Sequence, residues 1–199
     1  AREAMDTARE QCAVLVKGTE EEIVFTSSGT EANNLAVKGV AFAQRERGNH
    51  LVLSNIEHPS IDRSVAWLEE NGFTATRVAV DGEGRVSPKA ITEAVTEKTI
   101  LIATHHASHD LGTVQDVAAI GAMAAERGIP FLVDATASGG WLPVDVHAAN
   151  ISLLTLAPHR FSGPQGVGVL FRNRRVPLTP LLHGGVQEDG LRAGTENIA

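Results

Sequence analysis

Apolar runs of strand length alternate with segments of helical periodicity along almost the whole chain. The pattern predicts strands at residues 22–26, 50–54, 74–80, 99–104, 129–133, 151–156 and 167–171, and helices at residues 2–17, 30–47, 59–71, 88–95 and 114–127. Strands joined through helices pair in parallel, and a parallel sheet needs helices on both faces to cover it. The sequence therefore predicts an α/β fold with a mostly parallel, seven-stranded sheet and helices on both faces.

Size, charge and cysteine usage restrict the class of protein. The 199 residues suffice for one large domain, and no apolar run approaches the roughly 18 residues that a membrane span needs. The net charge of -7 argues against nucleic acid, because phosphate binding needs clustered Lys and Arg. Cys12 is the only cysteine and the first residues lack the pattern of a signal peptide. We expect a cytoplasmic protein with small-molecule or protein partners and no membrane association.

The first junction between a strand and a helix, Thr26 to Glu31, reads Thr-Ser-Ser-Gly-Thr-Glu. Free backbone N–H groups at a helix N-terminus attract anions, and the neighbouring hydroxyls strengthen that tendency, so the stretch suits a phosphate. The alternative is an ordinary N-cap, which small hydroxyl residues also favour. The sequence has no GxGxxG and no GxxxxGK[ST] motif, so neither a dinucleotide nor a nucleoside triphosphate is indicated.

Three more polar groups follow predicted strands. His58 lies after the strand 50–54, Asp134 closes the apolar run before it, and His159-Arg160 follows the strand 151–156 within a turn rich in Gly and Pro. A buried carboxylate needs a cation or hydrogen-bond donors, and a protonated ring nitrogen would satisfy it. Taken singly, a histidine in such a position is more often structural, and Arg160 is more often the partner of an acidic surface residue. Together the groups offer a phosphate cradle, a stacking imidazole and an acid for a ring nitrogen, which pyridoxal phosphate (PLP) requires.

In this order the residues resemble the cysteine desulfurases of the class V, fold-type I aminotransferase family. The matching motifs are TSSGTEANNLA at 26–36, EH at 57–58, VDAT at 133–136, GPQGVG at 163–168, and HGG to RAGT between 183 and 195. The resemblance covers essentially the whole chain as the large, PLP-dependent transferase-like domain. It implies a single cofactor-binding domain over residues 1–199, without the family's small C-terminal domain.

The resemblance also implies roles for individual residues. Gly29 and Thr30 would hold the phosphate together with His159, and His58 would stack on the pyridine ring as a catalytic residue. Asp134 would pair with the ring nitrogen, and His109 stands where the family has an Asn near the ring hydroxyl. Thr195 would reach the cofactor of a neighbouring subunit. The polar, glycine-rich tail 172–199 is therefore expected to leave its own chain and contact the partner in a homodimer.

The departures from the family pattern concern the covalent chemistry. Arg160 stands where the family has the lysine that forms the Schiff base, and a guanidinium is neither a base nor a usable nucleophile at biological pH. Ala137 and Ala157 replace a Gln and a Ser among the cofactor contacts. The family's sulfur-accepting cysteine lies beyond residue 199, and Cys12 does not match it. We therefore expect no covalent PLP and no desulfurase turnover by this chain. In the absence of cofactor we expect Arg160 to pair with Asp134.

Three interpretations remain open at this point. The first is a desulfurase-like enzyme that keeps PLP without a covalent bond and draws its missing groups from a partner or from a further C-terminal part. The second is a non-catalytic relative that acts as a scaffold or binds a partner protein. A third interpretation is a metal site from His105, His106, His109 and Asp110, although these residues fall in a predicted loop, where their spacing fixes no geometry.

Overall fold

The computed structural model describes residues 2–198. Its helices are α1 (Arg2–Val16), α2 (Gly29–Ala43), α3 (Pro59–Glu70), α4 (Pro88–Ala94) and α5 (Val117–Glu126). Its strands are β1 (Ile23–Thr26), β2 (His50–Ser54), β3 (Thr74–Val78), β4 (Thr99–His105), β5 (Phe131–Asp134), β6 (Leu153–Leu156) and β7 (Gly168–Arg172). Short 3-10 helices occupy Glu20–Glu22, Pro158–Phe161 and Gln187–Gly190.

The seven strands form one sheet in the order β1-β7-β6-β5-β4-β2-β3. The neighbours from β6 to β3 pair in parallel, and only β7 runs against its neighbours β1 and β6. The predicted seven-stranded, mostly parallel sheet is therefore confirmed. Because β6 and β7 are adjacent and antiparallel, the glycine-rich loop between them begins and ends at the same edge of the sheet.

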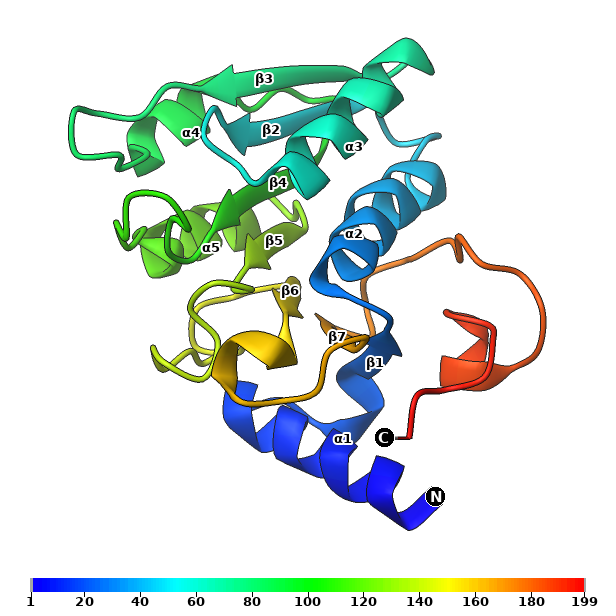
Figure 1. Cartoon of the computed structure of the whole chain (residues 1–199). Helices are drawn as coiled ribbons and strands as arrows, with labels where there is room; N and C mark the ends of the chain where they lie inside the picture. Colours follow the sequence, from blue (N-terminus) through cyan, green and yellow to red (C-terminus); the bar gives the residue numbers. More distant parts are fainter. Residues whose placement is uncertain (1, 199) are drawn as a thin grey trace.

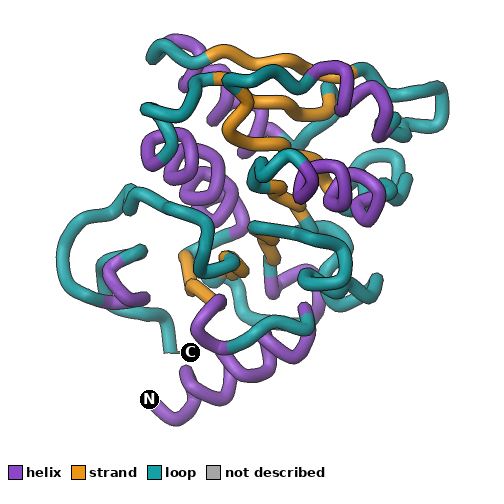
Figure 2. Tube along the Cα trace, turned by 180° about the vertical axis from the view of Figure 1, so that it is seen from behind, coloured by secondary structure: helices purple, strands orange, loops and turns teal. Residues whose placement is uncertain are grey.

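Helices cover both faces of the sheet, as predicted (Figure 1). Successive strand residues alternate between two apolar cores, so that in β5 Phe131 and Val133 pack on one side while Leu132 packs on the other. The first core also contains buried residues of α1, α4 and α5, and the second contains those of α2 and α3. Figure 2 shows the strands as the inner layer between these helices. The alternation places Asp134 on the α2 side.

The predicted start of the helix 114–127 is wrong by three residues, because the helix begins at Val117. Val114 instead forms an isolated antiparallel bridge with Ala107, and the Gln115 side chain accepts a hydrogen bond from the backbone N–H of Val86. Asp116 then caps the helix by accepting from the N–H of Ala119 at 3.0 Å. The apolar Val114 had extended the helical pattern, whereas tertiary contacts hold it in the preceding loop.

The tail after β7 packs on its own chain. Glu188 accepts two hydrogen bonds from the Arg9 guanidinium, at 2.8 and 2.9 Å, and one from the backbone N–H of Phe25 at 2.8 Å. These contacts satisfy part of the free edge of β1, where the sheet has no further strand. Further along, Arg192 binds Glu31 at the start of α2. The expectation that the tail is too polar to pack on its own chain is wrong, because partly buried ion pairs hold it together with apolar contacts from Val176, Leu178, Leu181 and Leu191 to the second core. Its contact with a partner subunit stays a prediction.

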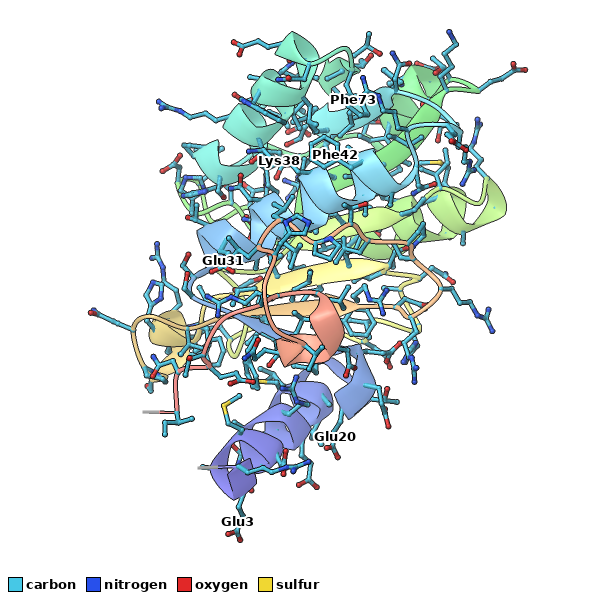
Figure 3. The ribbon with its side chains drawn as sticks, turned by 90° about the vertical axis from the view of Figure 1, so that its right-hand side faces the viewer. Glu3, Glu20, Glu31, Lys38, Phe42 and Phe73 are labelled. Atoms are coloured by element: carbon cyan, nitrogen blue, oxygen red, sulfur yellow. The ribbon has the colours of Figure 1, made fainter. Side chains whose placement is uncertain are left out.

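The Arg192–Glu31 pair should give the tail a pH-dependent attachment. Burial raises the pKa of Glu31, but hydrogen bonds from Arg192 and Ser27 outweigh it and hold the pKa below its ordinary value. The ionised pair therefore stabilises the fold above the unfolded-state pKa of about 4.3, and this contribution is lost as the pH falls through the lower folded-state value. Figure 3 labels Glu31 at the beginning of α2.

We expect Glu31→Gln to melt at a lower temperature than the parent at pH 6, with the difference shrinking as the pH is lowered to 3. Thermal unfolding followed by circular dichroism at several pH values measures this. Glu93→Gln is the matched control, because Glu93 forms only an exposed pair with Lys89 at 3.8 Å. A difference for Glu31→Gln that does not change with pH would contradict the assigned role of the pair.

Within residues 2–198, no helix combines the length and the apolar character that crossing a bilayer requires.

Candidate functional site

The polar groups singled out in the sequence gather at one edge of the sheet. The parallel strands β2, β4, β5 and β6 end at this edge, and β1, which is parallel to β6, ends there too. Register brings Thr26 opposite Gly168 and Asp134 opposite Thr155. The carboxyl ends of parallel strands are where ligands bind in open α/β sheets. The fold therefore places the predicted anion stretch, Asp134 and the His159-Arg160 turn around one region.

The N-terminus of α2 keeps two unused donors. Ser28 caps the helix by accepting from the N–H of Glu31 at 3.1 Å, and Glu31 in turn accepts from the N–H of Ser27 at 2.8 Å. The backbone N–H groups of Gly29 and Thr30 have no acceptor within residues 2–198. Gly29 is buried, and a Cβ built on it would lie 2.8 Å from Cγ2 of Thr136. The arrangement leaves two donors and the positive end of the helix dipole for an anion.

Asp134 is a buried carboxylate that is held only by neutral donors. It is 3% exposed, and its Oδ1 accepts from the N–H of Thr136 at 2.9 Å and from the Thr155 hydroxyl at 3.3 Å. Its Oδ2 accepts from the amide of Asn33 at 2.9 Å. No Lys, Arg or His in the described part of the chain forms an ion pair with it. A ligand with a protonated ring nitrogen would supply the missing positive charge.

His58 and His109 are brought together although they lie on different loops. Their ring centroids are 5.0 Å apart in an edge-to-face arrangement. His58 caps α3, with Nδ1 accepting from the N–H of Ser60 at 3.1 Å and lying 2.7 Å from the Ser60 hydroxyl. His109 lies at the surface, with Nε2 3.3 Å from Asp110. Two imidazole rings therefore border the same region as Asp134.

His159 and Arg160 follow β6 directly in the 3-10 helix Pro158–Phe161, and both are exposed. The predicted pair between Arg160 and Asp134 is wrong: the carboxylate accepts from Asn33 and Thr136 and forms no ion pair with Arg160. Arg160 is held by its backbone alone: its N–H donates to Ala157 and its carbonyl accepts from the indole of Trp141. Its guanidinium therefore remains at the surface.

The lysine that lies nearest to this region along the chain is Lys38, three turns into α2. Its Nζ lies over the Trp67 ring, 4.7 Å from the centroid, in a groove of about 450 Å³ between α2 and α3. Thr30 and His58 line the same groove. Figure 3 shows Lys38 beyond Glu31 along α2, on the side of α3. Thr195 is exposed in the tail, and its predicted contact with a second subunit stays a prediction.

The residues of the alternative metal site point in different directions. His105 is buried with Nδ1 3.2 Å from Glu57, which also accepts from the Ser54 hydroxyl. His106 instead contacts Ser138 at 3.0 Å, and burial, followed by the neighbouring His105, lowers the pKa of His106. Among residues 2–198, no three His, Cys, Asp or Glu side chains are arranged to hold a metal ion. The metal interpretation is therefore not supported.

Asn33, Ser60 and Thr155 belong to the site but were missed in the sequence. Asn33 is 1% exposed and contacts Asp134 and Ser60, each at 2.9 Å, while its carbonyl accepts from the Thr155 hydroxyl at 2.7 Å. The sequence did contain a feature that could have identified Asn33, namely a polar residue within an apolar stripe. Asn33 lies on the buried face of α2 together with Ala36 and Val40. Thr155 likewise interrupts the apolar strand Leu153–Leu156.

These residues fit pyridoxal phosphate without a covalent bond. Gly29 and Thr30 offer unused N–H groups for the phosphate, and the buried Asp134 lacks a cation that the ring nitrogen would provide. Ala157 lies beside Gly29 and offers no hydroxyl there. The residue at the end of β6, Arg160, lacks the amine chemistry that would bond the aldehyde.

Comparison with known proteins agrees with this geometry. The family model described as aminotransferase class V matches residues 1–199. The cysteine desulfurase IscS of Methanosarcina thermophila is 45% identical over 197 residues, which cover 99% of this chain and 49% of that protein. The IscS of Dictyoglomus turgidum is 41% identical over 198 residues, covering 100% of this chain and 50% of that protein. The chain thus spans about half the length of the curated relatives it matches.

Solved structures show the same similarity. A structure described as SspA in complex with cysteine is similar with a TM-score of 0.95 and 41% identity, covering 98% of this chain and 57% of that one. DndA from Streptomyces lividans is similar with a TM-score of 0.92 and 30% identity, covering 99% of this chain and 57% of that one.

Proposed function

Because the chain belongs to the class V aminotransferase family, whose members are PLP-dependent, we propose that it is a cysteine-desulfurase-like protein that binds PLP reversibly. We further propose that it does not itself release sulfur from cysteine. One observation carries the proposal: the same edge of the sheet holds a buried Asp134 that has no ion-pair partner among residues 2–198 and the unused backbone N–H groups of Gly29 and Thr30. Arg160, at the end of β6, supports the second part, because it cannot bond the aldehyde.

When bound, PLP supplies an aldehyde and a ring that withdraws electrons from a bound amino acid. The chain's own residues bind and orient it. Gly29 and Thr30 would donate to the phosphate with His159 beside them, and Asp134 would hold the proton on the ring nitrogen. His58, with His109 at its edge, would cover the ring.

The alternative function is that of a non-catalytic relative that serves as a scaffold or binds a partner protein. The alanines at 137 and 157, together with Arg160 and His109, are the observations that favour it, since the resemblance places all four around the cofactor. A homodimer, with the tail reaching the second subunit, and a sulfur-acceptor protein are the partners we propose. The cytoplasmic location stays a prediction.

Titration with PLP tests the proposal directly. We expect an absorbance and fluorescence change that saturates with PLP concentration and disappears on dialysis. After borohydride treatment no PLP should remain bound to the protein. No sulfide should be released from cysteine. Asp134→Ala should weaken binding at least about tenfold, because it removes a charged hydrogen-bond partner. A stable yellow adduct that borohydride fixes to a lysine would contradict the proposal. No binding at all would favour the scaffold alternative.

A further inference from the structure

The order of donors and acceptors around Asn33 follows from the chemistry of its neighbours. A carboxylate only accepts hydrogen bonds, so the Asn33 atom that faces Asp134 Oδ2 at 2.9 Å must be the amide nitrogen. The amide oxygen then faces Thr155, whose hydroxyl donates to it at 2.7 Å. The second hydrogen of the same nitrogen points to the Ser60 hydroxyl oxygen at 2.9 Å. Both hydrogens of the Asn33 amide are therefore used.

The same order continues to His58. The Ser60 oxygen accepts from Asn33, and its single hydrogen points to His58 Nδ1 at 2.7 Å. The backbone N–H of Ser60 donates to the same nitrogen at 3.1 Å. A ring nitrogen that accepts two hydrogen bonds carries no proton. In its neutral form, His58 therefore has its proton on Nε2.

We propose that Asn33 is a positioning residue that holds the Asp134 carboxylate and, at the same time, orients the Ser60 hydroxyl that donates to His58 Nδ1. It is buried, it comes from α2, and it joins the end of β5 to the start of α3, so the two groups cannot adjust separately. His58 consequently presents an N–H donor, and no basic nitrogen, to whatever the site holds. The link to a cofactor rests on the proposed function, whereas the tautomer is a property of the chain itself.

Nuclear magnetic resonance of the full chain, labelled with ¹⁵N-histidine and without ligand, tests the tautomer. We expect the His58 signal, assigned with His58→Gln, to show an unprotonated Nδ1 in the parent. In Asn33→Leu the Ser60 hydroxyl loses the hydrogen bond that orients it, so its own hydrogen bond to His58 Nδ1 should weaken and the Nδ1 chemical shift should move, while the backbone N–H of Ser60 keeps Nδ1 unprotonated. Gln44→Leu is the matched control, because Gln44 is a buried residue at the C-cap of α2, and its side-chain amide bonds to Ile100 and Arg47 at the other end of the helix from the site. Its His58 signal should not change.

PLP titration of the same variants gives the second measurement. We expect Asn33→Leu to bind PLP about tenfold more weakly, and Gln44→Leu to bind as the parent does. If Asn33→Leu does not fold, Asn33→Ser, which is too short to reach both partners, replaces it in both experiments. A proton on Nδ1 of the parent, or an unchanged Nδ1 chemical shift in a folded Asn33 variant, overturns the inference. A parent that binds no PLP defeats the proposed function alone, because the tautomer is measured without ligand.

Discussion

Replacing Arg160 by lysine should convert reversible PLP binding into a covalent adduct that borohydride fixes at residue 160. The turn that carries Arg160 does not depend on its side chain, since only its backbone N–H and carbonyl are bonded, to Ala157 and Trp141. A lysine should therefore occupy the same backbone position. It adds an amine that can attack the aldehyde once deprotonated, which a guanidinium cannot do.

The adduct is measured by absorbance before reduction, and by the mass of the modified peptide after reduction and digestion. We expect it to rise from undetectable in the parent to nearly one per chain in Arg160→Lys. Arg160→Met, which removes the cation without adding an amine, should stay unmodified. Modification of Lys38 in the parent would show that this lysine leaves the Trp67 ring to enter the site, and the assignment of residue 160 would be wrong. Sulfide release is not expected to follow, because forming the adduct supplies no group that accepts the sulfur.

Gly168→Ala should destabilise the fold and weaken PLP binding together. Gly168 begins β7, and a Cβ built on it would collide with the backbone of Ser28 and lie 2.6 Å from the Thr26 hydroxyl. Ser28 caps α2, and its carbonyl accepts from the Ala32 N–H and from the Thr26 hydroxyl. A backbone cannot move aside as a flexible side chain does, so the start of α2 must shift. We expect a loss of about 3 kcal/mol in the free energy of unfolding.

The same shift displaces Gly29 and Thr30, so PLP affinity should fall at least about tenfold in the folded variant. Urea unfolding and PLP titration measure the two effects. Gly82→Ala is the control, because a Cβ there meets no atom within 4 Å and the backbone does not require glycine. We expect it to match the parent in both measurements. If Gly168→Ala were as stable as the parent, the close approach of β7 to the start of α2 would be disproved.

The alternation of apolar runs and amphipathic helices determined the fold, because each buried strand and each helical stripe must be covered by another element. It correctly predicted seven strands and five helices on two faces. It also correctly placed Asp134, the 26–31 junction and His159-Arg160 at strand ends, since a strand end is a local property of the sequence. The motifs added the family, which the comparisons confirmed.

Only the tertiary structure decided which polar groups meet. Asp134 ends β5 and Arg160 lies in the turn after β6, yet the carboxylate binds Asn33, which lies on a helix 101 residues earlier in the chain. The tail stays on its own chain because Glu188 meets both Arg9 and the free edge of β1. Charge and periodicity assign a residue to an element, but they contain no information on distances between elements. Hydrogen bonds act only over about 3 Å, and such distances are set when the helices pack on the sheet.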